Sequence, residues 1–107
     1  MRILRFIVTG QRIIQDPNCD FSGLVPGTEG YLQAKFTFSH EWKDSVKVAG
    51  FWSIMGKEYE PQVIDKNGTC IIPAEALKAK NFRVNVIGKN DSLKLTTNKV
   101  TVSQNGD

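Results

Sequence analysis

The sequence predicts an all-β fold, an antiparallel β-sandwich of seven to nine short strands. Three segments alternate apolar and polar residues with a period of two, and none has the 3.6-residue stripe of an amphipathic helix. The clearest is residues 31–38, where Leu32, Ala34 and Phe36 share one face. Turn-forming residues recur at roughly ten-residue spacing, as expected of a sandwich. Strands with one apolar and one polar face are typical of antiparallel sheets.

Length, composition and charge narrow the class of protein. The 107 residues predict a single domain over residues 1–107. Apolar residues make up 40% of the chain and charged residues 23%, which is too apolar for a disordered segment. The net charge is +3, and the 14 basic residues are spread along the chain rather than clustered. Because nucleic-acid binders usually cluster their basic residues, we consider nucleic acid an unlikely main partner.

In the first half of the chain, strands are predicted over residues 3–8, 31–38 and 46–54. Gly10 and Gln11 supply a bend after the first strand, residues 12–15 continue as a short extended piece, and a glycine-rich loop leads to the next strand. A polar connection follows, in which we expect one helical turn with Ser39 as its cap. The last of these strands is apolar on both sides in its second half, which suits a central strand.

In the second half, strands are predicted over residues 59–64, 69–72, 82–87, 92–95 and 99–102. Pro61 interrupts the first of these and favours a sheet edge. Asn67 and Gly68 predict a hairpin with a type I′ turn, because that turn needs positive φ angles. Pro73 predicts the start of a short helical turn that ends by Lys80. We expect six residues of these strands in the core: Phe36, Phe38, Val48, Trp52, Val84 and Val86.

The cysteines and the N-terminus bear on the cell compartment. Cys19 and Cys70 are too far apart for a CxxC motif, and two ligands do not make a zinc site, so we expect free thiols in a reducing environment. The apolar stretch after Met1 is broken by Arg5 and is too short for a signal peptide. No segment has the length of a membrane span. We therefore expect an uncleaved intracellular product.

Catalytic and ligand-binding candidates are few. His40 is the only histidine and adjoins Glu41, but no serine or cysteine nucleophile lies in a recognisable motif. We expect a solvated loop histidine, no enzyme activity, and no metal or cofactor. Trp42 and Tyr59 lie at strand ends, where exposed aromatic side chains can anchor a partner. Together with His40 they are the predicted partner-binding residues.

Three segments of the chain carry a family resemblance. They are residues 6–11, residues 34–42 with a strand followed by Ser-x-x-Trp, and residues 95–106 with Thr-Asn-x-Val. These segments resemble small domains of tail and baseplate proteins, of the upper-baseplate type, from phages of Gram-positive bacteria. The resemblance implies an immunoglobulin-like sandwich that begins a longer fibre or baseplate subunit. It also implies a location in the virion or the bacterial host cytoplasm.

The function expected from the sequence is that of a non-enzymatic phage or prophage module in the tail, baseplate or fibre. It would act through a protein partner or a surface glycan at exposed loops and strand edges. Two alternatives stay open: a small phage-encoded inhibitor of a host enzyme or defence protein, and a nucleic-acid-binding barrel of the OB type. The sequence also leaves a homo-oligomer open.

Overall fold

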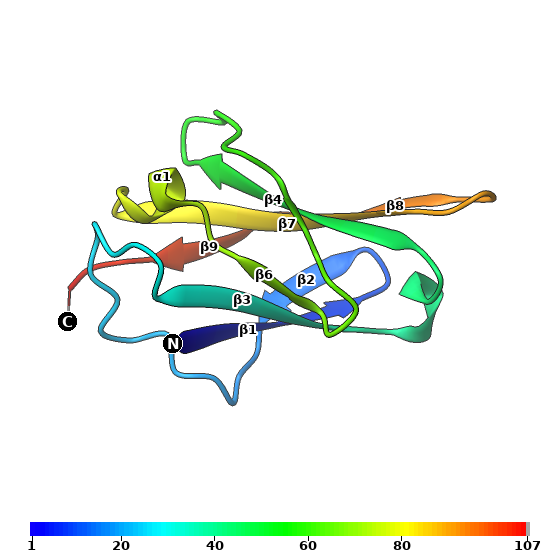
Figure 1. The fold of residues 1–107 in the computed structure, drawn as a ribbon, viewed down its shortest axis with the longest axis horizontal. Coiled ribbons are helices and arrows are strands. Elements are labelled where there is room, and N and C mark those ends of the chain that lie inside the picture. The colour runs from blue at the N-terminus through cyan, green and yellow to red at the C-terminus, as the bar shows by residue number, and fades with distance from the viewer. Residues whose placement is uncertain (107) are drawn as a thin grey trace.

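Two β-sheets pack face to face in the computed structural model of the protein, which describes residues 1–106 (Figure 1). The first sheet has four strands, in the spatial order β2 (Arg12–Gln15), β1 (Arg2–Thr9), β3 (Leu32–Phe38) and β6 (Thr69–Ile71). The second has five, namely β5 (Gln62–Val63), β4 (Val46–Ser53), β7 (Asn81–Lys89), β8 (Lys94–Thr96) and β9 (Val100–Ser103). β8 and β9 both pair with β7, along different parts of its length.

The chain passes between the sheets three times, after β3, after β5 and after β6. β3 and β6 are neighbours in the first sheet, and β4 and β7 are neighbours in the second. Two of the three connections contain a short helical element: η1 (His40–Trp42) follows β3, and α1 (Ala74–Leu77) follows β6. The all-β sandwich predicted from the sequence is confirmed.

One strand pair departs from the predicted antiparallel arrangement. β1 and β3 are parallel neighbours, paired from Arg2 with Leu32 to Val8 with Phe38. The cause is the connection: β2 carries the chain back along β1, and residues 16–31 then begin β3 at the same end as β1. A hydrogen bond from the amide of Arg2 to the carbonyl of Tyr31 ties these two strand starts together.

The core lies between the sheets and is formed by the inward side chains of every long strand. Strand residues in the core that are 3% exposed or less include Leu4, Phe6, Val8, Phe36, Phe51, Phe82, Val84, Val86 and Val102. The prediction for Phe36, Val84 and Val86 is confirmed, while Phe38 is partly buried and packs against the core.

The predicted core face of β4 is wrong. Ala49 and Phe51 are fully buried, whereas Val48 and Trp52 lie on the opposite face and are half-buried. The strand is apolar on both faces in this region, so the period-two pattern fixes which side chains share a face without showing which face is inside.

The Asn67–Gly68 turn forms, but it is not the predicted hairpin. Gly68 has a φ of +79°, while Asn67 has a negative φ, which excludes a type I′ turn. The carboxylate of Asp65 holds the turn by accepting hydrogen bonds from the amides of Asn67 and Thr69, both at 2.9 Å. The strands on either side pair with different partners, β5 with β4 and β6 with β3, so the turn joins the two sheets.

One side of the sandwich is closed by side-chain hydrogen bonds. Asn98 accepts from the amide of Ile13 at 2.9 Å and donates to the carbonyl of Ile13 at 3.2 Å. The side-chain amide nitrogen of Gln15 donates a hydrogen bond to the carbonyl of Thr101. The two bonds to Asn98 satisfy the backbone amide and carbonyl of Ile13 on the free edge of β2, so these groups are not offered to another strand.

Candidate functional site

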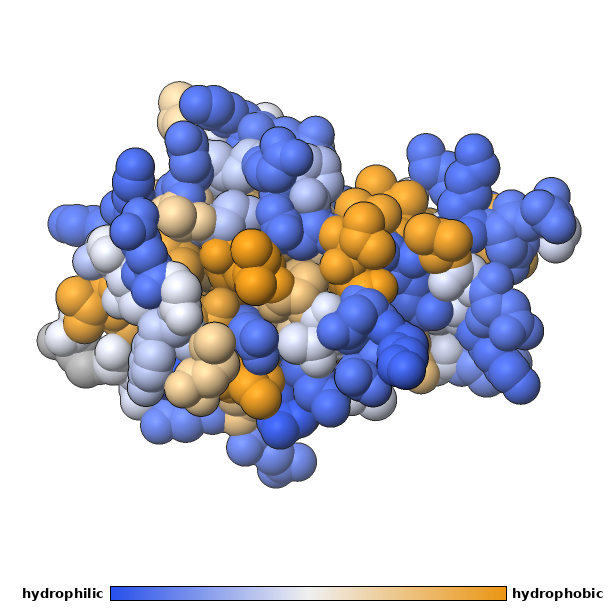
Figure 2. Space-filling view, viewed as in Figure 1, coloured by the Kyte–Doolittle hydropathy of each residue, from blue (hydrophilic) through white to orange (hydrophobic). Residues whose placement is uncertain are grey.

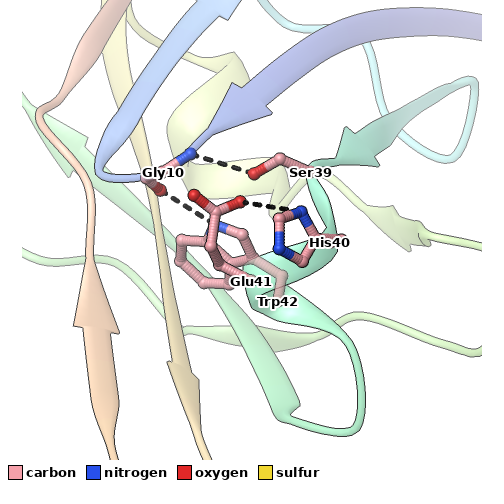
Figure 3. Close-up of polar contacts among 5 residues, drawn as sticks. All are labelled: Gly10, Ser39, His40, Glu41 and Trp42. Atoms are coloured by element: carbon pink, nitrogen blue, oxygen red, sulfur yellow. Dashed lines mark hydrogen bonds and ion pairs between the residues drawn. The ribbon is translucent and has the colours of Figure 1, made fainter.

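Trp42 is fully buried, so the prediction that it lies exposed for a partner is wrong. Its indole nitrogen donates a hydrogen bond to the carbonyl oxygen of Gly10 at 2.8 Å (Figure 3). Its ring packs against Gly88 of β7, where an added Cβ would lie 2.6 Å from the nearest ring carbon. Gly88 therefore supplies the space that lets this tryptophan leave the connection and enter the core.

Ser39 lies three residues before Trp42 and contacts the same glycine. Its hydroxyl oxygen accepts a hydrogen bond from the amide of Gly10 at 3.0 Å (Figure 3). Serine and tryptophan together satisfy both backbone polar groups of Gly10, which has a φ of +57°. The Ser-x-x-Trp pattern thus attaches the β1–β2 turn to η1, a structural role.

His40 points into solvent, with its side chain 94% exposed. Its Nδ1 lies 3.9 Å from a carboxylate oxygen of Glu41. The pKa of Glu41 is lowered, chiefly by a hydrogen bond from the Ser39 hydroxyl, with smaller help from its own backbone amide and from His40. The hydroxyl of Ser39 is thus engaged with Gly10 and Glu41 and does not form a nucleophile–base pair with His40. A contact between His40 and a partner stays a prediction.

Tyr59 is half-buried and packs against the hydrophobic core. Its amide donates to the carbonyl of Phe51 at 2.8 Å, which holds it beside β4. Tyr59 and His40 therefore belong to separate parts of the fold: the first lies near the end of β4 and the second precedes its start. A role for Tyr59 in binding stays a prediction.

The outer face of the second sheet presents apolar side chains that the sequence did not single out. We call Val46, Val48, Val63 and Ile87 the valine face. Val48 is the cross-strand neighbour of both Val63 on β5 and Ile87 on β7, so these three form one row across the sheet. Val46 and Val63 are 67% and 71% exposed. Figure 2, which views the sandwich from its side, shows hydrophobic surface beside β4 and in other places on that side.

A hollow of about 490 Å³ adjoins the valine face. Val46, Val48 and Ile87 form its apolar part, and Lys89, Asn90 and Asp91 at the β7–β8 turn form its polar rim. An open hollow of this kind on a regular sheet can receive an apolar side chain of another molecule.

The far end of the same outer face is built around Trp52. Its indole nitrogen donates to the side-chain oxygen of Asn85 at 2.9 Å. The ammonium of Lys99 lies 3.9 Å from the centre of its ring, which is a cation–π contact. A Cβ on Gly50 would collide with Asn85, so glycine at this position gives room for the Trp52–Asn85 hydrogen bond. Trp52 is thus an aromatic residue of the surface, covered by a flexible lysine.

Other chemistry finds little support in the described residues. Within residues 1–106, no group of three potential metal ligands comes together. Both Cys19 and Cys70 are free, as predicted. Burial, with the nearby Asp65 as a second cause, raises the pKa of the Cys70 thiol to about 12, so it stays protonated and unreactive at neutral pH. None of the helices described is both long and apolar enough to cross a bilayer.

Known proteins give no further guide to this site. No protein family, curated protein or solved structure matches the chain. The resemblance to phage tail and baseplate domains therefore stays a prediction from the sequence. The surface of the protein is then the remaining guide to its function, and the valine face is the most distinctive part of that surface.

Proposed function

We propose that this chain is a non-enzymatic module that binds a protein partner through the valine face, as a structural or attachment protein of a phage virion would. The observation that supports this is the pair Val46 and Val63, both more than two-thirds exposed on the outer face of a regular sheet. Burying a valine side chain contributes about 1.5–3 kcal/mol. The surrounding apolar row and hollow would add to this in a complex.

The valine face does not distinguish a virion component from the alternative of a small phage-encoded inhibitor, because both would dock on a protein. It does favour a protein over a surface glycan, since sugars stack on exposed aromatic rings. Here Trp42 is buried and Trp52 is covered by Lys99, so that Tyr31 is the one exposed aromatic side chain within residues 1–106. The nine-stranded sandwich also differs from the five-stranded barrel of an OB fold, which removes the architectural basis of that alternative.

Capture with matched variants tests the proposal. The immobilised chain is exposed to lysates of phage-infected and uninfected bacteria, and retained proteins are identified by mass spectrometry. We expect one specific partner that is lost with Val63→Asp and with Val46→Asp. Ile71→Asp is the control, because Ile71 is 59% exposed on the outer face of the first sheet.

Retention of the same partner by both valine variants would refute the proposed face. A tail or capsid protein among the captured proteins would support the virion role, and a host enzyme would support the inhibitor role. A glycan array probed with the unmodified chain tests the remaining class of partner, a surface glycan. Specific glycan binding that survives Val63→Asp would overturn the protein-binding proposal.

A further inference from the structure

A pair of lysines lies directly beside the valine face. Lys89 and Lys94 are cross-strand partners on β7 and β8, and both are exposed. Lys89 is also the cross-strand partner of Val46, so the row reads valine, lysine, lysine across three strands. Like charges directly opposite each other on a sheet destabilise it. The protein therefore has a destabilising pair of like charges at the rim of the valine face.

No carboxylate within residues 1–106 forms an ion pair with either lysine. The single ion pair among the described residues joins His40 and Glu41, neither of which lies on β7 or β8. Asp91 lies on the β7–β8 turn and lines the hollow, but it forms no ion pair with either lysine within the described residues. The lysine ammonium groups are therefore available to carboxylates of another molecule.

The charges that the structure places on the outer face point the same way. Strand pairing puts Arg83, Lys89 and Lys94 there, and Lys99 lies over the ring of Trp52. The carboxylates placed beside them are those of Glu58, opposite Trp52, and Asp91, which lines the hollow. A second copy of this chain, docked face to face, would bring like charges together. The surface is thus complementary to an acidic protein and poorly complementary to itself.

On the basis of the proposed function, we infer that the partner presents an acidic protein surface: an apolar side chain enters the hollow, and carboxylates beside it pair with Lys89 and Lys94. The apolar contact supplies most of the affinity. The lysines at the rim select the partner and speed its association, because exposed charges act mainly on the rate of encounter. Binding should weaken as salt rises, since exposed pairs are screened.

Synthetic peptides test the inference without the natural partner. The isotope-labelled full chain is titrated with a peptide that has a Leu-Trp centre flanked by glutamates, with its lysine-flanked counterpart, with a glutamate peptide that has a serine centre, and with a short duplex DNA. Backbone amide shifts map each contact. We expect the acidic Leu-Trp peptide to shift the amides around Val48, Ile87 and Lys89, and to bind at least about tenfold more tightly than the other three.

Charge reversal gives the matched control. Arg5 and Lys35 form the same kind of like-charge pair on the outer face of the first sheet, and they are also direct cross-strand partners. The double variant Lys89→Glu/Lys94→Glu should reverse the preference between acidic and basic peptides. The double variant Arg5→Glu/Lys35→Glu should leave it unchanged. The amide spectrum of each variant shows whether it is folded.

Several outcomes would overturn the inference. These are equal binding of both Leu-Trp peptides, shifts confined to the first sheet, DNA binding as tight as the acidic peptide, or dimerisation of the free chain through the valine face. The two proposals remain distinguishable. Loss of the natural partner with Val63→Asp but not with Lys89→Glu/Lys94→Glu would support the valine face and refute the acidic partner, whereas loss with neither would refute both.

Discussion

Trp42 and Trp52 each lie in the environment that the sequence would suggest for the other. Trp42 stands in a polar connection and is fully buried, while Trp52 stands in an apolar strand and lies half-buried on the outer face. Both are accommodated by a glycine on a neighbouring part of the sheet: Gly88 beside Trp42, and Gly50 beside Trp52 and its partner Asn85.

The difference shows that a large side chain is placed by the space available to it as well as by its neighbours in sequence. The ring of Trp42 fills the place of a side chain missing from β7, and its one polar atom finds the carbonyl of Gly10. The ring of Trp52 has no such place inside, because Phe51 occupies the core side of β4. The first tryptophan therefore stabilises the fold, and the second lies on the outer face that also carries the valine face, at its far end.

Replacing the two tryptophans should give the largest contrast. Trp42→Ala leaves a cavity in the core and an unpaired carbonyl at Gly10, so we expect a loss of about 3–5 kcal/mol in the free energy of unfolding. Trp52→Ala removes a cation–π contact and a half-buried ring, so its cost should be smaller by at least about 2 kcal/mol. Urea unfolding of both variants measures this, and equal costs would contradict the assigned environments.

Gly88→Ala should have the next largest effect. The added methyl group meets the ring of Trp42, so we expect about 1–3 kcal/mol of destabilisation from overpacking. In the double variant Gly88→Ala/Trp42→Ala the ring is absent, and the alanine at position 88 should then cost much less. A double-mutant cycle measures this coupling. Purely additive effects would mean that the ring does not rest on Gly88.

A smaller effect on stability is expected from the two cysteines, of which Cys70 is buried and Cys19 is half-buried. The pKa of Cys70 rises from 9.0 to about 12 on folding, because the thiol is buried and lies near Asp65. Above pH 9 the unfolded chain loses this proton while the folded chain keeps it, so the contribution of Cys70 to stability falls between pH 9 and pH 12.

Unfolding curves across this pH range check that sign. The variant Cys70→Ala should lose less stability between pH 9 and pH 12 than the unmodified chain, and the control Cys19→Ala, which keeps Cys70, should still show the loss that Cys70 causes. Identical slopes for all three proteins would show that Cys70 is not shielded from water.

The sequence predicted the fold class more accurately than it predicted the candidate binding surface. Period-two alternation and turn residues located the strands, because they report local geometry. The parallel pairing of β1 with β3 was missed, because it depends on where the connection over residues 16–31 returns the chain. The valine face was missed because β4 is apolar on both sides. The alternation of Val46 and Val48 with Lys47 and Ala49 does indicate that the two valines share one face of β4. It does not show whether that face lies inside or outside.

The most direct test of the account is photo-crosslinking in the captured complex. A photoreactive phenylalanine analogue is placed at Val63, in the valine face, or at Thr37, which is exposed on the outer face of the first sheet. The account predicts a crosslink to the partner from position 63 and none from position 37. A crosslink from position 37 alone would contradict the central claim that this protein binds through the outer face of its second sheet.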